Sequence, residues 1–120
     1  MAWPVEYGGQ GASFVRQMIF KEESAIQKAP TSGGAEDILA PALMIHGTEE
    51  QKREYLAPIS RGEVLWSQGY SEPGAGSDLA ALQTRATRDG DEYVINGQKV
   101  WNGSHRGDWI HTLVRTDPEA

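Results

Sequence analysis

The sequence contains no cysteine and few basic residues. Without cysteine the chain can form neither a disulfide framework nor a thiolate zinc site, and it has no cysteine nucleophile. Eleven Lys and Arg residues stand against seventeen Asp and Glu residues, which gives a formal net charge of -6. This negative balance, with no basic cluster along the chain, argues against nucleic acid as a partner. Because the chain has no cysteine thiol, redox chemistry would need a bound cofactor.

Long apolar stretches are also missing. No window approaches the roughly 20 apolar residues of a membrane-spanning helix, so we expect no membrane span. The first residues lack the basic start and apolar run of a signal peptide, and we expect a cytoplasmic protein. His105 and His111 have no carboxylates at ligand spacing, so no metal site is predicted. At 120 residues the chain can form one modest domain or pieces of two.

The first half of the chain has apolar residues at helical spacing. A helix is predicted over about residues 13–29, with Ser13 just before its first apolar residue. A second, strongly apolar helix should begin near Ile38, with Pro41 near its first turn, and end at Gly47. We expect this second helix to be mostly buried.

A capping box indicates a third helix. The Thr48 hydroxyl and the Gln51 side chain can each satisfy a free N–H at its start, and Gly62 marks its expected end. Three apolar residues should face inward: Tyr55, Leu56 and Ile59.

Beyond Gly62 the pattern changes to short β-rich runs, at residues 64–66, 93–95, 100–101 and 110–114. Asn96-Gly97 is a strong two-residue hairpin signal between residues 93–95 and 98–101, and Asp89-Gly90 is a weaker one. An antiparallel meander is the natural interpretation. The sequence thus predicts an α+β fold with helices in residues 1–62 and an antiparallel β-domain in residues 63–120.

Residues 70–79, YSEPGAGSDL, form a glycine- and serine-rich loop. Its backbone N–H groups could hold a phosphate or carboxylate, helped by a helix start capped by Ser77 or Asp78. The loop is neither a G-x-G-x-x-G fingerprint nor a Walker P-loop, because no lysine follows Gly76-Ser77. The pattern alone favours a plain turn over such a cradle.

A family resemblance changes that balance. Residues 71–78, SEPGAGSD, followed by residues 90–101, GDEYVINGQKVW, closely resemble the middle-domain signature of the acyl-CoA dehydrogenase family. The resemblance covers essentially the whole chain. Its other segments are residues 3–11, the helix with Glu22 and Glu23, and residues 46–52 and 58–63.

The resemblance implies a three-part fold, of which this chain resembles the later N-terminal helices and the opening strands of the middle β-domain, without the C-terminal helical bundle. It implies FAD as cofactor and oxidation of an acyl-CoA to the 2,3-enoyl-CoA, by loss of an α-proton and transfer of a β-hydride to flavin. It also implies electron-transfer flavoprotein as electron acceptor and a homo-oligomer, dimer or tetramer, for the full-length family.

The resemblance also implies which residues of this chain stand at the family's site positions. Backbone groups near Tyr70 and Ser71 would face the pyrimidine edge of the flavin, where a donor stabilises charge on the reduced ring. Gly76 and Ser77 would lie near the diphosphate, and Ser77 would also contact acyl-CoA. Trp101 would pack beside the flavin, which is compatible with a core aromatic on a strand. The full set of cofactor candidates is Gln68, Gly69, Tyr70, Ser71, Gly76, Ser77, Trp101, Gly103 and Ser104.

The sequence departs from the family pattern between Trp101 and Asp108, where it is one residue short. Gly103 therefore takes the place of a hydroxyl expected to meet the redox-active flavin nitrogen, with Ser104 as the shifted alternative. The family's catalytic base is a glutamate of the C-terminal bundle, so no catalytic residue is predicted here. The tempting substitutes are expected to be exposed structural carboxylates: Glu22, Glu23 and Glu72.

A second hypothesis is that the chain alone is a non-catalytic remnant or an interaction fragment of the same fold. The Arg106-Gly107-Asp108 tripeptide would make it an adhesion module, but three residues recur by chance and we do not favour that interpretation. Open sheet edges and apolar faces of a partial β-domain should make the isolated chain associate or aggregate.

Overall fold

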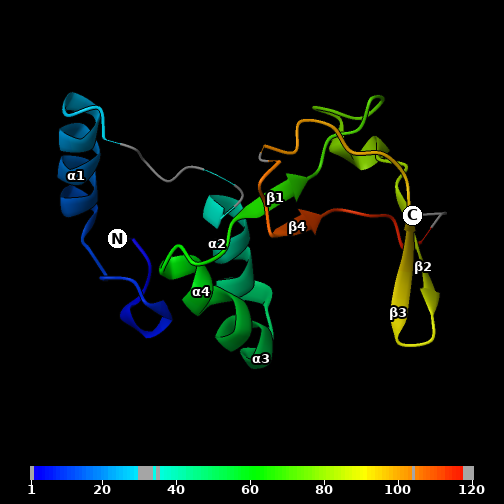
Figure 1. Ribbon diagram of the computed structural model, residues 1–120, viewed down its shortest axis with the longest axis horizontal. Helices are drawn as coiled ribbons and strands as arrows, with labels where there is room; N and C mark the ends of the chain where they lie inside the picture. The colour runs from blue at the N-terminus through cyan, green and yellow to red at the C-terminus, as the bar shows by residue number, and fades with distance from the viewer. Residues whose placement is uncertain (1, 30–33, 35, 104, 118–120) are drawn as a thin grey trace. The chain divides into compact units, whose positions relative to one another are not determined.

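The computed structural model describes residues 2–29, 34, 36–103 and 105–117 (Figure 1). The chain divides into two compact units, Met1–Leu65, which we call the helical unit, and Trp66–Ala120, which we call the β unit. The helical unit contains a 3₁₀ helix, Val5–Tyr7, and the helices α1 (Phe14–Ile26), α2 (Glu36–His46), α3 (Glu49–Gln51) and α4 (Ala57–Ser60). The β unit contains β1 (Trp66–Gly69), β2 (Arg85–Asp89), β3 (Glu92–Asn96) and β4 (Trp109–Thr112). The predicted α+β class is confirmed.

Helix α1 begins where the sequence predicts and ends earlier. The Ser13 side chain accepts a hydrogen bond from the Arg16 backbone N–H, as a helix N-cap does. The helix ends at Ile26, three residues before the predicted end, because Lys28 adopts a left-handed backbone with φ of 52°. Most apolar side chains of α1 are exposed, Phe14 by 74%.

Helix α2 begins before its apolar run. It starts at Glu36, so Pro41 lies inside the helix rather than near its first turn as predicted, and the proline removes one N–H donor there. Leu39 and Ala40 are buried, whereas Ile45 is 72% exposed. The expectation of a mostly buried helix was therefore wrong for this chain, since only one side of α2 is covered.

The third predicted helix is continuous from α3 to α4, with a π-helical turn, Lys52–Leu56, between them. The Thr48–Gln51 capping box is present in both directions. Leu56 is 1% exposed and Ile59 is 7% exposed, so they form the core of the helical unit together with α2, and Tyr55 is half-buried. The helix ends at the predicted place, with Gly62 in the left-handed region at φ of 67°.

The β unit holds two separate strand pairs (Figure 1). Strand β1 pairs with β4 in parallel, Trp66 opposite Trp109, and β2 pairs with β3 antiparallel. The Trp66 and Trp109 rings stack with centroids 5.8 Å apart. The expected antiparallel meander is thus wrong for β1 and β4, because a parallel pair joins strands that are far apart in the sequence.

The hairpin forms at the weaker of the two predicted turns. Asp89 pairs with Glu92 across a tight turn in which Gly90 has φ of 62°. Gly97 makes no hairpin, and residues 98–101 form no strand, contrary to the prediction. A Cβ on Gly97 would lie 2.6 Å from the Thr84 Cα, so this glycine permits close backbone approach instead of a turn.

Candidate flavin-facing site

Two of the predicted cofactor segments lie side by side in the β unit. Gln68 and Gly69 end strand β1, and Tyr70 and Ser71 follow directly. The Gln68 N–H donates to the Asn102 carbonyl at 3.1 Å, and the Val100 N–H donates to the Ser71 carbonyl at 2.8 Å. These bonds bring residues 68–71 against the neighbours of Trp101, although the two segments are about thirty positions apart in the sequence. The same pairing makes them candidates for one ligand-facing surface.

Gly69 is fixed by packing. A Cβ at this position would lie 2.7 Å from the Thr112 hydroxyl oxygen and 3.1 Å from Ile110 Cδ1. A side chain would therefore separate β1 from β4. The requirement for glycine at this predicted cofactor position already follows from the fold.

The loop after Ser71 contains a plain turn, as its pattern favoured. The Glu72 N–H donates to the Ala75 carbonyl at 2.8 Å, and the Ala75 N–H donates back to the Glu72 carbonyl at 3.1 Å. Pro73 and Gly74 occupy the corner, where proline is common. The backbone groups of Glu72 and Ala75 are thus satisfied within the loop.

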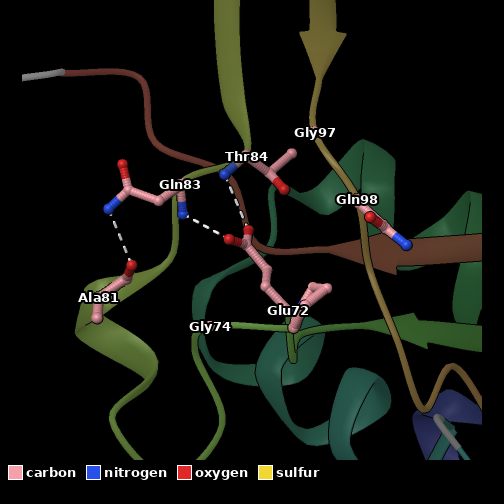
Figure 2. Close-up of a pocket in the computed structure, with 8 residues that line it drawn as sticks. Glu72, Gly74, Ala81, Gln83, Thr84, Gly97 and Gln98 are labelled. Atoms are coloured by element: carbon pink, nitrogen blue, oxygen red, sulfur yellow. Dashed lines mark hydrogen bonds between the residues drawn. The ribbon is translucent and has the colours of Figure 1, made fainter.

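Glu72 is buried, contrary to the expected exposed carboxylate, and its side chain is 7% exposed. One carboxylate oxygen accepts hydrogen bonds from the Thr84 N–H and the Lys99 ammonium, both at 2.8 Å. The other accepts from the Gln83 N–H at 2.6 Å (Figure 2). Glu22 and Glu23 on α1 are exposed, as expected. The local sequence could not show that Glu72 is buried while Glu22 and Glu23 are exposed, because the donors to Glu72 come from distant positions.

The surroundings of Glu72 determine its protonation state. Burial by itself raises the pKa of the carboxyl, because it disfavours the charged form. Hydrogen bonds from the Lys99 ammonium and from the backbone N–H groups of Gln83 and Thr84 oppose this effect and lower the pKa of Glu72 to about 2. The group is ionised at neutral pH and is a poor proton acceptor, since an effective general base has a pKa near the working pH.

Lys99 joins the turn to the end of β1. Its side chain is 8% exposed, and its ammonium donates to the Tyr70 carbonyl at 3.0 Å as well as to Glu72. Sequence analysis missed both members of this ion pair as site residues. No local pattern marks Lys99, which follows Gly97-Gln98 in an irregular segment.

A pocket of about 530 Å³ lies beside the turn (Figure 2). Its only charged lining group, Glu72, is neutralised by Lys99. The pocket therefore presents no net charge to a ligand. Its other lining residues are Pro73, Gly74, Ala81, Gln83, Thr84, Gly97 and Gln98.

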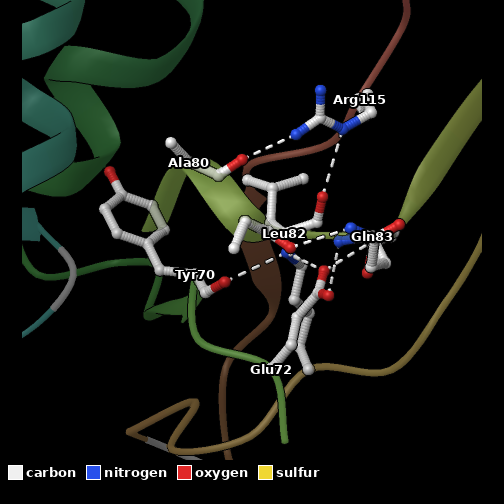
Figure 3. Close-up of polar contacts among 9 residues, drawn as sticks. Tyr70, Glu72, Ala80, Leu82, Gln83 and Arg115 are labelled. Atoms are coloured by element: carbon white, nitrogen blue, oxygen red, sulfur yellow. Dashed lines mark hydrogen bonds and ion pairs between the residues drawn. The ribbon is translucent and has the colours of Figure 1, made fainter. Parts of the chain in front are cut away.

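Arg115 holds the next stretch of the loop. Its guanidinium donates to the Ala80 carbonyl at 2.6 Å and to the Leu82 carbonyl at 3.1 Å (Figure 3). Its backbone N–H donates to the Thr84 carbonyl, and its carbonyl accepts from the Ala86 N–H. Residues 80–84 are thereby fixed between the turn and β2.

Gly76 and Ser77 are exposed, and a Cβ on Gly76 would meet nothing within 4 Å. The helix that follows Asp78 is a 3₁₀ helix of three residues, Leu79–Ala81, and Asp78 makes no side-chain cap bond. Such a short helix provides no useful dipole, so the helix-start part of the cradle interpretation is not supported. What remains is an open glycine backbone that a ligand can approach.

Trp101 is not the core aromatic of a strand. It is 89% exposed, and its backbone lies in the left-handed region with φ of 59°. That conformation is uncommon for a bulky residue and is a recurrent feature of functional sites. An exposed indole is free to lie against a planar ligand.

Gly103 has a structural reason to be glycine. Its φ is 84°, so any side chain there would be strained even though a Cβ would meet no atom within 4 Å. A hydroxyl residue at this position would therefore need a different backbone. The alternative, Ser104, lies outside the described residues.

One further contact links a predicted site residue to β4. The Tyr70 hydroxyl lies 3.2 Å from His111 Nδ1, with the rings in an edge-on arrangement at 5.5 Å. Burial lowers the pKa of His111 and raises the pKa of Tyr70, because it disfavours both charged forms. A neutral imidazole and a neutral phenol are the pair that can share one hydrogen bond here.

Across the described residues no cluster of His, Cys, Asp or Glu could hold a metal ion, and no helix of that region is long and apolar enough to cross a membrane.

The residues fit a flavin on three counts that the structure itself supplies. Segments 68–71 and 100–102 are hydrogen-bonded together, Trp101 presents an exposed ring, and Gly76 leaves its backbone open. An exposed aromatic ring can lie against a planar ring system, and an uncovered glycine lets a diphosphate approach the backbone.

Comparison with known proteins matches each half of the chain to a domain of one family. Residues 1–63 match the family described as acyl-CoA dehydrogenase, N-terminal domain, and residues 67–120 match acyl-CoA dehydrogenase, middle domain. The chain is 50% identical to acyl-CoA dehydrogenase FadE26 of Mycobacterium tuberculosis over 121 aligned positions, which cover all of this chain and 30% of FadE26.

Solved structures of acyl-CoA dehydrogenases and related proteins are also similar to this chain. The ChsE4–ChsE5 complex from Mycobacterium tuberculosis superposes with a TM-score of 0.88 at 50% identity, over 98% of this chain and 31% of that one. A structure described as the Tcur3481–Tcur3483 steroid ACAD gives a TM-score of 0.87 at 48% identity, over 99% of this chain and 31% of that one. A glutaryl-CoA dehydrogenase from Mycobacterium smegmatis in complex with FADH2 gives 0.58 at 37% identity, over 63% of this chain and 20% of that one.

The chain spans about a third of the length of FadE26 and of the ChsE4–ChsE5 chain that it matches. Two family domains adjoin in the order expected from the motifs, and together they account for residues 1–63 and 67–120. On these grounds the chain belongs to the acyl-CoA dehydrogenase family.

Proposed function

We propose that this chain carries part of the flavin and acyl-CoA site of an FAD-dependent acyl-CoA dehydrogenase. The observation that supports this most directly is the hydrogen-bonded pairing of residues 68–71 with residues 100–102, next to the exposed ring of Trp101. A related structure that contains FADH2 supports the choice of flavin.

Each group would have a distinct task. Bound FAD would supply the hydride acceptor for oxidation of an acyl-CoA thioester to its 2,3-enoyl product. Ser71 would present its hydroxyl or N–H to the pyrimidine edge of the ring, and Gly76 and Ser77 would contact the diphosphate. Ser77 would also contact acyl-CoA, and Trp101 would cover one side of the ring.

The residues near the turn would orient ligands without removing a proton. Glu72 is unsuited to be the base, because three donors engage its carboxylate and its pKa is about 2. We therefore assign no catalytic residue within this chain. In the proposed setting the protein works in the cytoplasm, passes electrons to an electron-transfer flavoprotein, and assembles as a dimer or tetramer. The complex of ChsE4 with ChsE5 supports assembly.

The test is a titration of the purified 120-residue chain with FAD, followed by flavin fluorescence and absorbance. Saturable binding that is weakened by Trp101→Ala supports the proposal, and acyl-CoA can then be added to look for bleaching of the flavin. A chain that is folded by circular dichroism yet binds no FAD would favour the second candidate function, a non-catalytic fragment of the same fold. The observation that favours that candidate is Gly103, whose φ of 84° strains the hydroxyl residue expected at this position from the family resemblance.

A further inference from the structure

The two segments assigned to the flavin are held together by few backbone contacts. Residues 97–101 form no strand, so no continuous ladder joins them to residues 68–71. The bonds Gln68 N–H to Asn102 carbonyl and Val100 N–H to Ser71 carbonyl are separated by the Trp101 peptide in its left-handed conformation. A ladder interrupted in this way leaves the relative position of the two segments weakly specified.

We propose that the Glu72–Lys99 ion pair supplies the missing constraint, which makes Glu72 and Lys99 positioning residues for the cofactor-facing surface. This inference rests on the proposed function for its flavin part. The ammonium of Lys99 bridges the Tyr70 carbonyl at 3.0 Å and the Glu72 carboxylate at 2.8 Å. Ser71, between these two acceptors, is bonded in turn to Val100. Three consecutive residues, 70 to 72, are thus each tied to Lys99 or Val100.

The carboxylate extends the constraint to β2. Glu72 accepts from the Gln83 and Thr84 backbone N–H groups, and Thr84 immediately precedes the first residue of β2. A chain of charged hydrogen bonds therefore runs from the end of β1 through Lys99 and Glu72 to the start of β2. Charged hydrogen bonds are shorter and more directional than neutral ones, so they fix orientation as well as distance.

A buried ion pair is a costly way to gain stability alone. Removing both charges from water offsets much of their attraction, and an apolar pair of similar volume is often as stable. Both side chains are less than a tenth exposed. The compact ammonium with its separate donors can satisfy a carbonyl and a carboxylate at once, which apolar side chains cannot do. The arrangement therefore serves to place the Tyr70 and Ser71 backbone relative to Trp101.

The experiment compares Lys99→Met and Glu72→Gln with matched controls in the helical unit. Lys52→Met removes the ammonium of the Lys52–Glu49 pair, in which Glu49 is exposed, and Glu63→Gln removes the carboxylate of the Arg61–Glu63 pair. The first readout needs no flavin: amide hydrogen exchange of the Val100 and Gln68 N–H groups, measured relative to the amides of the β2–β3 hairpin in the same sample. The second is FAD affinity, together with the visible circular dichroism of the bound flavin.

We expect Lys99→Met to speed exchange at Val100 by about ten- to hundredfold, the factor that corresponds to loss of one charged hydrogen bond. FAD binding should weaken by a similar factor, and the flavin dichroism should change. Lys99→Arg should restore part of both effects, because a guanidinium can still bridge the two acceptors. The two control variants should leave both readouts unchanged.

A purely structural role predicts a different pattern. If Lys99→Met lowers global stability but leaves the relative exchange of Val100 and the dichroism of bound flavin unchanged, the inference is overturned. If the Lys99→Met variant does not fold, the Glu72→Gln variant tests the inference by the same exchange measurement at Val100, since this substitution removes the charge and keeps the size of the side chain. If the wild-type chain binds no FAD, the proposed function fails for this chain, and the exchange data still decide whether the ion pair positions these segments.

Discussion

Replacing Glu72 by glutamine tests how strongly its carboxylate stabilises the β unit. The pKa of this group is lowered from 4.5 to about 2 in the folded chain. A tenfold change in proton affinity is worth about 1.4 kcal/mol, so this shift corresponds to roughly 3 kcal/mol of folding free energy. Because the folded pKa is lowered, the stabilisation is complete above pH 4.5 and disappears as the pH falls to about 2.

The expected result is a stability difference that depends on pH. At pH 7 the Glu72→Gln variant should unfold with a free energy roughly 3 kcal/mol below that of the wild type, and near pH 2 the two should converge. Urea unfolding at several pH values can be followed by the fluorescence of Trp66 and Trp109, whose stacked rings report on the β unit. Glu63→Gln, whose carboxylate is 52% exposed, serves as the control and should leave this transition unchanged. An equal difference between wild type and Glu72→Gln at pH 7 and pH 2.5 would refute the reasoning.

Four substitutions test the packing and the exposed ring. Gly97→Ala should lower stability by about 1–3 kcal/mol in urea unfolding, because its Cβ would lie 2.6 Å from the Thr84 Cα, whereas Gly74→Ala should be tolerated because its Cβ would meet nothing within 4 Å. Trp101→Ala should change stability by less than about 0.5 kcal/mol, since the residue is 89% exposed, yet weaken FAD binding in a fluorescence titration. Leu56→Ala should cost about 2–5 kcal/mol in thermal or urea unfolding, because the side chain is 1% exposed, and a smaller loss would contradict its place in the core.

Features that depend on neighbouring residues could be predicted from the sequence. The Thr48–Gln51 capping box and the glycine that ends the third helix involve residues within one turn of each other, and both are present. The predicted end of α1 and the predicted start of α2 were less accurate. Lys28 adopts a left-handed backbone without being glycine, and α2 begins at two acidic residues before its apolar run. Such boundaries depend on single residues that carry a weak signal.

Strand pairing could not be predicted in the same way, because it depends on contacts between distant residues. The Asn96-Gly97 dipeptide has the composition of a hairpin turn, but Gly97 is needed for its contact with Thr84. Parallel pairing of β1 with β4 has no local signature at all. The family resemblance located residues 68–71 and 101–103 as candidates, and the fold brings the two segments together, but neither the local pattern nor the resemblance pointed to Lys99.

The glycine-rich loop combines the two alternatives that its sequence raised. Residues 72–75 are a turn, closed by two backbone hydrogen bonds and anchored by a buried carboxylate. On either side of the turn, Ser71 is half-buried and Gly76 is exposed with open space where a Cβ would lie. A carboxylate engaged by three donors cannot also accept a substrate proton at neutral pH, because the contacts that lower its pKa remove its basicity. The features that make Glu72 a good anchor are therefore the same features that exclude it as a base. We accordingly infer that this loop contributes to the proposed reaction by orientation and that proton removal falls to another group.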